Sequence, residues 1–340
     1  MKTTDLQRAL DNKESTKGLI LYGRAFEELP EEVFELKQLE ELEIGNTNLK
    51  VISERIGELE NLTDLSLNNN QLSSLPAAFA KLKKLKRLYL NQNQLSEIPA
   101  SIFELSALQS LSLENNQIDQ VGDGLTRLSN LTDLRLSQNN IRQLPTAFGQ
   151  LKKLKHLILD NNQLKVLPDS LGDCEQLDML HLIKNQLRKL PNSIGQLKKL
   201  RQLNLTRNQL SELPDTIVQC SGLQNLILRF NKLRALPTDI DQLQNLRQFS
   251  ISNNKFTSLP DSLGNCQRLS QLAAARNQLE RLPYALYKLP MLRWIDLEGN
   301  QLRVAGKEFF MMPKLRSLNL SKNKIREMEA PLYPNRIEIL

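Results

Sequence analysis

The sequence predicts an α/β solenoid, curved into a horseshoe, with a concave parallel β-sheet and short 3-10 or turn segments on its convex side. Two observations predict this fold. An asparagine recurs every 23 residues along most of the chain, and leucines recur at fixed distances around each asparagine. Because one such unit cannot bury its apolar side chains alone, units of equal length have to stack on one another.

The asparagines form a ladder of twelve equally spaced residues. Each follows a predicted strand at a turn, where its amide can donate and accept hydrogen bonds to backbone groups that would otherwise be buried without partners. We therefore expect a structural role for the whole ladder. Its members are Asn70, Asn93, Asn116, Asn139, Asn162, Asn185, Asn208, Asn231, Asn254, Asn277, Asn300 and Asn323.

The residues around each asparagine follow the pattern L-x-x-L-x-L-x-x-N-x-L, as in residues 200–210. The alternation x-L-x-L-x has the period of a β-strand, so its leucines share one face. Units of the same length and direction pair their strands in parallel. With two weaker units at the start, the frame gives fourteen repeats over residues 16–330, between caps over residues 1–15 and 331–340.

The caps are expected to cover the first and last units. Leu6 and Leu10 are four residues apart in a polar segment, which predicts a short amphipathic helix. At the other end, closure of the last unit is assigned to Ile337, Ile339 and Leu340.

The second half of most units reads L-P-x-x-h-x-x-L, where h is apolar, as in residues 190–197. Proline favours an extended chain, and the following apolar spacing of three predicts one 3-10 or helical turn. Glycines such as Gly172 are expected to end this turn. Three units lack the Leu-Pro pair, at residues 52–53, 121–122 and 305–306, and there we expect a reshaped convex segment.

Phe310 and Met311 occupy positions that are polar or small in most units. They could form an exposed apolar spot near the C-terminus. Alternatively they pack against Tyr287 of the preceding unit, and we expect this packing.

The charge distribution is uneven along the chain. The net charge is +7, yet the first 60 residues hold 14 acidic and eight basic residues. Lysine-rich runs at residues 83–87, 152–155 and 198–201 precede predicted strands and line one edge of the solenoid. A solvated rim is the simplest explanation, and a ridge that binds a polyanion is the alternative. No stretch approaches the roughly 18 consecutive apolar residues of a membrane span.

The three cysteines, Cys174, Cys220 and Cys266, are 46 residues apart and occupy a position that other units give to leucine. Two units separate each pair, hence about 10 Å between Cα atoms, beyond the ~7 Å limit for a disulfide. We expect buried free thiols, which favour a reducing compartment.

The two histidines, His156 and His181, are predicted to point outward from neighbouring strands. A relay of Ser137, His181 and Asp160 would lie on an open, wet sheet without an oxyanion hole. A metal bridging His156 and Asp160 would have to span about 13 Å along one strand. We therefore expect neither a catalytic site nor a metal site.

The residues that flank the strand leucines should point to solvent on the concave face. Exposed aliphatic side chains cluster there in four consecutive units, with arginine and histidine around them, and the single tryptophan lies farther along. Apolar anchors within a polar rim are typical of interface hot spots, whereas single exposed apolar residues are common. The predicted partner-binding residues are Tyr89, Arg135, His156, Ile158, Met179, His181, Ile183, Arg207, Ile227, Arg229, Phe230 and Trp294.

The complete unit, L-P-x-x-(I/F/L)-x-x-L-x-x-L-x-x-L-x-L-x-x-N-x-L, resembles the 23-residue class of leucine-rich repeats over about residues 16–330. Proteins of this class include Ras-associated scaffolds and bacterial and plant intracellular proteins. The resemblance implies protein binding, usually through the concave sheet, and no cofactor.

These observations together predict a non-enzymatic protein-protein interaction module or scaffold that binds a protein partner on its concave face. The alternative is binding of nucleic acid or an anionic membrane through the lysine-rich edge. We expect a cytoplasmic monomer with a protein partner, no nucleic acid partner, no membrane span and no bound metal.

Overall fold

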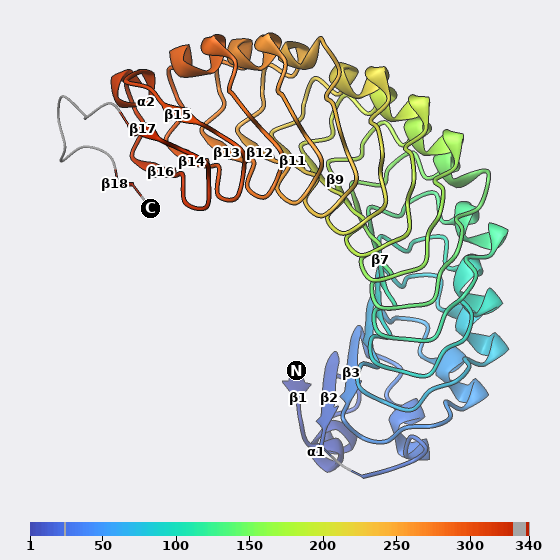
Figure 1. Cartoon of the computed structure of the whole chain (residues 1–340). Coiled ribbons are helices and arrows are strands. Elements are labelled where there is room, and N and C mark those ends of the chain that lie inside the picture. Colours follow the sequence, from blue (N-terminus) through green and yellow to red (C-terminus); the bar gives the residue numbers. More distant parts are fainter. Residues whose placement is uncertain (24, 329–337, 340) are drawn as a thin grey trace. The chain divides into compact units, whose positions relative to one another are not determined.

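The computed structural model describes residues 1–23, 25–328 and 338–339 (Figure 1). The chain divides into two compact units, unit 1 over residues 1–163 and unit 2 over residues 164–340. Within each unit, parallel strands lie on the inner side of the stacked coils and short 3-10 helices lie on the outer side. The predicted solenoid with a parallel sheet is confirmed.

Unit 1 contains one α-helix, eight strands that pair in chain order and six 3-10 helices within its described residues. The helix is α1 (Leu6–Asp11). The strands are β1 (Lys2–Thr3), β2 (Gly18–Tyr22), β3 (Glu41–Gly45), β4 (Asp64–Ser66), β5 (Arg87–Tyr89), β6 (Ser110–Ser112), β7 (Asp133–Arg135) and β8 (His156–Ile158). The 3-10 helices are η1 (Glu31–Glu35), η2 (Glu54–Glu58), η3 (Ala77–Lys81), η4 (Ala100–Glu104), η5 (Asp123–Arg127) and η6 (Phe148–Gln150).

Unit 2 repeats this arrangement, and α2 (Glu308–Met311) replaces the last 3-10 helix. Its main strands are β9 (Met179–His181), β10 (Gln202–Asn204), β11 (Asn225–Ile227), β12 (Gln248–Ser250), β13 (Gln271–Ala273), β14 (Trp294–Asp296), β16 (Ser317–Asn319) and β18 (Glu338–Ile339). A separate pair is formed by β15 (Val304–Ala305) and β17 (Glu327–Met328). The 3-10 helices are η7 (Asp169–Asp173), η8 (Asn192–Gln196), η9 (Asp215–Gln219), η10 (Ile240–Gln242), η11 (Asp261–Asn265) and η12 (Tyr284–Lys288).

The core of each unit lies between the sheet and the 3-10 helices. In the repeat that contains β10, the buried residues include Leu200, Leu203, Leu205 and Leu210, and Ile217 of η9 is buried as well. The strand register advances by 23 residues from one strand to the next, as in the pairing of Leu203 with Leu226. Equal register places the same repeat position of successive units in one straight row.

The ladder asparagines connect neighbouring coils. Asn208 Nδ2 donates to the carbonyl of Leu205 at 3.0 Å and to that of Leu182, one coil earlier, at 2.8 Å. Asn208 Oδ1 accepts from the backbone N–H of Leu187 at 3.0 Å. Asn93, Asn231 and Asn277 make the same three kinds of hydrogen bond. One side chain thus satisfies backbone groups of two coils.

The residue before a ladder asparagine has a left-handed backbone conformation. Its φ is 56° at Asn69, 58° at Arg207 and 56° at Phe230. Asparagine adopts this conformation readily, whereas a bulky aromatic residue rarely does. Phe230 is therefore an unusual choice at a turn where the other repeats of the asparagine ladder have a polar residue or, at Gly299, glycine.

The sequence pattern predicts that glycines end the 3-10 helices of the convex side, and this prediction is wrong. Gly172 lies inside η7, and its backbone does not have a positive φ. A Cβ at Gly172 would lie 2.4 Å from the carbonyl oxygen of Ser193 in the next coil. The glycine is required because neighbouring 3-10 helices approach closely.

Two of the three repeats without a Leu-Pro pair keep the ordinary convex segment. The prediction that this segment is reshaped is therefore wrong for these two. Ser53 takes the place of proline before η2, and its Oγ accepts from the N–H of Arg55 at 3.3 Å. Gly122, before η5, has φ −64° and ψ 150°, as proline would. Only the unit at residues 305–306 is reshaped, by α2.

The N-terminal segment forms helix α1, with Asp5 as its N-cap. Ala9 is its fully buried residue, whereas Leu6 and Leu10 are only half-buried. The cap also adds a strand, because β1 pairs with β2. At the other end β18 pairs with β16, and Ile337 and Leu340 lie outside the described residues.

The predicted packing of Met311 against Tyr287 is wrong, whereas Phe310 is half-buried. Phe309 is the buried residue of α2, and its ring makes an edge contact with Tyr287 at 5.0 Å between centroids. Met311 is 68% exposed. The short helix turns Phe309 inward and leaves Met311 at the surface.

Candidate functional site

Four of the predicted binding residues lie in unit 1, and none of them is buried. Asp133 connects two of them, because its carboxylate accepts from Arg135 Nε at 2.8 Å and lies 2.9 Å from His156 Nδ1. Ile158 is half-buried and stands in register with Arg135. Tyr89, on β5, is also half-buried. Asp133 lies 23 residues before His156, one repeat length, and this spacing is the signal in the sequence for their contact.

The other eight predicted residues lie in unit 2, and all of them are half-buried or exposed. Met179 and His181 belong to β9, and Ile183 follows that strand. In register, His181 aligns with Asn204 of β10, which aligns with Ile227 of β11. The aliphatic residues therefore do not form one unbroken row in this unit.

The turn after β11 carries an aromatic ring between two guanidinium groups. Phe230 is 37% exposed, and the Cζ atoms of Arg207 and Arg229 lie 5.1 Å and 5.9 Å from its ring centroid. Each distance is within the range of a cation–π interaction. The pair of arginines holds Phe230 at the surface.

A hollow that we call the trough lies on the inner face of β11 to β14. Its floor consists of Ser250 and Ala273, which are in register with Ile227 on one side and Asp296 on the other. Ile227 and Trp294 line its opposite walls, and its volume is about 380 Å³. Two strands with small side chains between larger ones produce a hollow about 10 Å wide. Of the predicted binding residues, Ile227, Arg229 and Trp294 line this one pocket.

The floor of the trough contains an unsatisfied polar group. Ser250 is 4% exposed, and its Oγ has no hydrogen-bond partner among the described residues. A buried hydroxyl without a partner is destabilising and uncommon, so it calls for an explanation. Ser101, Ser137 and Ser193 have the same kind of buried hydroxyl among the described residues, so this feature alone does not mark a site.

Three arginines that sequence reasoning missed lie where β12 to β14 begin. Arg247, Arg268 and Arg293 line a second pocket of about 460 Å³, which shares Gln271 and Trp294 with the trough. We call these arginines the basic edge. They are 21 and 25 residues apart, so no run of charge marks them in the sequence. Aligning the residues before each strand at the 23-residue repeat would have found them.

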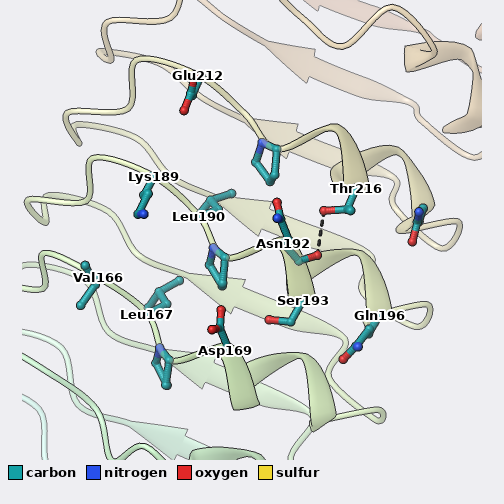
Figure 2. A pocket seen from close by; sticks show the side chains of 14 residues that line it. Val166, Leu167, Asp169, Lys189, Leu190, Asn192, Ser193, Gln196, Glu212 and Thr216 are labelled. Atoms are coloured by element: carbon teal, nitrogen blue, oxygen red, sulfur yellow. Dashed lines mark hydrogen bonds between the residues drawn. The ribbon is translucent and has the colours of Figure 1, made fainter.

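Another hollow of unit 2, about 910 Å³, lies on the convex side between the Leu-Pro segments that lead into η7, η8 and η9 (Figure 2). Its charged residues, Asp169, Lys189 and Glu212, have mixed signs, and no aromatic residue lines it. Thr216 Oγ1 donates to the carbonyl of Asn192 across it at 2.7 Å. The groove follows from the stacking of similar units and has no recognisable specificity.

The candidate nucleophiles, the three cysteines and Ser137, are buried. The three cysteines are free and buried, and burial raises the pKa of the Cys220 and Cys266 thiols to about 12. Within the described residues, no group of three or more His, Cys, Asp or Glu could hold a metal ion. Ser137 is buried, and its Oγ has no hydrogen-bond partner in the described part of the chain.

The lysine-rich runs lie before the strands, as expected, and several ammonium groups already have neutral partners. In unit 1, Lys84 and Lys153 donate to Asn61 and Asn130, each at 2.7 Å. In unit 2, Lys199 donates to Gln176 at 2.5 Å. Among the residues that the structure describes, no helix is long and apolar enough to cross a membrane.

The geometry defines a solenoid repeat protein, with one strand and one short outer segment in nearly every coil. Residues 31–135, 100–203 and 191–309 match the leucine-rich repeat region family. The matches cover more than half of the chain, so the protein belongs to the leucine-rich repeat family. No curated protein matches the chain.

Solved structures agree with this assignment. The Leptospira interrogans LRR protein LIC12759 is 28% identical and has a TM-score of 0.80, with 97% of this chain and 100% of that chain covered. A TDR receptor is 29% identical with a TM-score of 0.76, covering 91% of this chain and 56% of the receptor. Toll of Drosophila, in its complex with Spatzle, is 25% identical with a TM-score of 0.79, covering 99% and 52%.

Proposed function

We propose that the protein is a non-enzymatic interaction module or scaffold, and that the inner face of unit 2 binds a protein partner through the trough and Phe230. The observation that carries this proposal is the trough, a hollow of about 380 Å³ with Ile227 and Trp294 in its lining and the small side chains of Ser250 and Ala273 as its floor. Apolar and aromatic anchors around a small-residue floor resemble the hot spots of protein interfaces.

The surroundings of the trough favour a macromolecular ligand over a small one. The trough is open and joins a second pocket at Trp294, whereas small-molecule sites usually enclose most of the ligand surface. Phe230 projects from a turn beside the trough, and aromatic residues and arginine are enriched in protein interfaces. Toll, a structural neighbour, is seen with the protein Spatzle, which supports the same use here.

The compartment is proposed from the cysteines. All three are free thiols buried in the core. Free thiols persist most readily in a reducing compartment such as the cytoplasm. The proposed contact does not include the lysine-rich runs. It also does not include the unit 1 residues Tyr89, Arg135, His156 and Ile158.

Site-specific photocrosslinking tests the proposal. A photoreactive phenylalanine analogue at Phe230 is expected to capture a defined protein in an extract of the source cells, whereas the same analogue at Val166, which is 52% exposed on the convex side, should not. The captured protein is then purified and titrated against the full chain. Replacing Trp294 by Ala should weaken binding by ~1–4 kcal/mol. Capture at Val166 alone would refute the proposed face.

Ser250→Ala separates binding from folding. The Ser250 hydroxyl has no protein partner to lose, so its removal should leave stability unchanged or increased. Affinity for the captured protein should nevertheless fall, because the ligand loses a hydrogen bond. A drop in stability together with unchanged affinity would assign Ser250 to the fold and contradict the proposed contact.

A further inference from the structure

We infer that the partner presents an acidic segment, whose carboxylates contact the basic edge while a neighbouring apolar side chain enters the trough beside Trp294. This inference rests on the proposed function, because it names the chemistry of the partner for the same face. It is carried by the charges at the start of β12 to β14 and by the continuity of two pockets.

Within the described residues, no carboxylate neutralises the basic edge. Arg247, Arg268 and Arg293 are all exposed, and within the described residues none of them has a carboxylate within 4.0 Å. Arg268 donates instead to the neutral Asn245 Oδ1 at 2.6 Å.

Other arginines of unit 2 do have acidic partners. Arg201 lies 3.6 Å from Asp178, and Arg276 lies 3.7 Å from Glu298. The pocket of the basic edge contains no acidic residue, and its remaining lining is Ser270, Gln271, Met291 and Trp294. Three like charges around one pocket repel one another, so an anionic ligand would be attracted to it.

Guanidinium groups suit carboxylates well. The planar fork of arginine donates two parallel hydrogen bonds to a carboxylate, and it is more weakly hydrated than the ammonium of lysine. The basic edge therefore differs in chemistry from the lysine-rich runs at residues 83–87, 152–155 and 198–201. A ligand with several carboxylates fits the edge better than a single small anion, because three separate arginines line it.

The neighbouring trough adds an apolar requirement. Trp294 and Gln271 line both pockets, so the basic edge and the trough are continuous. Ile227, Ala273 and Trp294 offer apolar surface to a side chain, and the Ser250 hydroxyl offers a hydrogen bond. A peptide can place a carboxylate and an apolar group at neighbouring residues.

A nucleic acid fits this arrangement less well. Asp296 follows Trp294 on β14 and borders the trough, so a phosphate backbone that crosses the inner face there would meet negative charge, whereas an apolar side chain of a peptide would not be repelled. Binding of a single strand also uses successive aromatic residues on which bases stack. Trp294 is the single tryptophan of the chain and the one aromatic residue of the basic-edge pocket.

The inference is tested with the full chain and synthetic peptides. The probe is a glutamate-rich peptide that contains a leucine pair, and its control has glutamine in place of each glutamate. Trp294 is the single tryptophan, so its fluorescence reports occupancy of the site directly. The glutamate peptide should change the emission and saturate, with affinity that falls as salt is added. The glutamine peptide should bind at least about tenfold more weakly.

Charge-removing variants locate the contact. Arg247→Gln, Arg268→Gln and Arg293→Gln break no ion pair, and combining them should weaken peptide binding about tenfold to 100-fold. Arg281→Gln, an exposed arginine on the way to η12, is the matched control and should bind as the wild type does. Thermal unfolding of each variant should match that of the wild type.

Four outcomes would overturn the inference. The first two are that the glutamate peptide does not bind, or that both peptides bind with equal affinity. The third is that a thymidine oligonucleotide binds more strongly and displaces the peptide. The fourth is that the Trp294 fluorescence changes with protein concentration alone. The last would identify a second copy as the occupant, since residues 1–60 hold 14 acidic residues. Capture at Phe230 would still support the proposed function in each case, so the two claims fail separately.

Discussion

Replacing Asn208 by Ala should lower the free energy of unfolding by ~1–3 kcal/mol, the cost of one unsatisfied buried donor. Asn208 Oδ1 is the acceptor for the N–H of Leu187, which the substitution leaves buried without a partner. The two carbonyls that Asn208 contacts each keep a second hydrogen-bond donor after the substitution. Leu182 O also accepts from Asn185 at 3.2 Å, and Leu205 O also accepts from Asn231 at 2.9 Å.

Asn208→Asp should be more damaging than Asn208→Ala. An aspartate keeps the acceptor for Leu187 but cannot donate to the carbonyls of Leu182 and Leu205 when it is ionised. Its charge would also be buried next to carbonyl oxygens, which raises the cost of desolvation. The order of stability is therefore expected to be Asn, Ala, Asp at neutral pH, and the aspartate variant should recover as the pH falls and its carboxyl becomes protonated.

Urea unfolding followed by circular dichroism measures both effects, with the slope of the transition compared among variants. Asn192→Ala serves as control, because the Asn192 side chain is exposed on η8. A loss below about 0.5 kcal/mol for Asn208→Ala, equal to that of the control, would refute the view that the ladder satisfies otherwise orphaned backbone groups.

Three further perturbations test the packing. Gly172→Ala should cost ~1–3 kcal/mol, because its Cβ would press on the Ser193 carbonyl; unchanged urea unfolding would contradict the close approach. Gly122→Pro should gain ~0.4–1 kcal/mol, since φ is already −64°, and a lower melting temperature would argue against it. The three cysteines should resist iodoacetamide until urea unfolds the chain, because the pKa of two of them is raised to about 12; rapid alkylation detected by mass spectrometry would show that they are accessible.

The sequence predicted the fold because the information is periodic. Identical spacing of the ladder asparagines determines the unit length, and unit length determines the strand register, as Leu203 opposite Leu226 illustrates. Contacts between repeats are harder to predict from the sequence, because they depend on the distance between neighbouring coils. Gly172 marks the convex turn in the sequence, and only the nearby Ser193 carbonyl explains why it is glycine.

The candidate site was predictable only in part. Ile227, Phe230 and Trp294 could be placed on the inner face from strand alternation alone. The missing partner of Ser250 could not be predicted, because satisfaction of a hydroxyl depends on every atom around it. Arg247 and Arg293 are far apart in the sequence and become neighbours of one pocket through the stacking of units.

Each ladder amide forms hydrogen bonds with two coils. An interior coil is therefore hydrogen-bonded through these amides to both neighbouring coils, whereas an end coil is bonded to one. Asn323 is less buried than Asn208, and among the described residues it is the one ladder member that donates to the carbonyl of Leu320. Local opening is therefore expected to start at the C-terminal coil and to advance inward, so hydrogen exchange should be fastest there. The trough reaches Trp294 on β14, and β14 pairs directly with β16 of that coil, so opening of the end coil would loosen the Trp294 wall of the trough before its Ile227 wall.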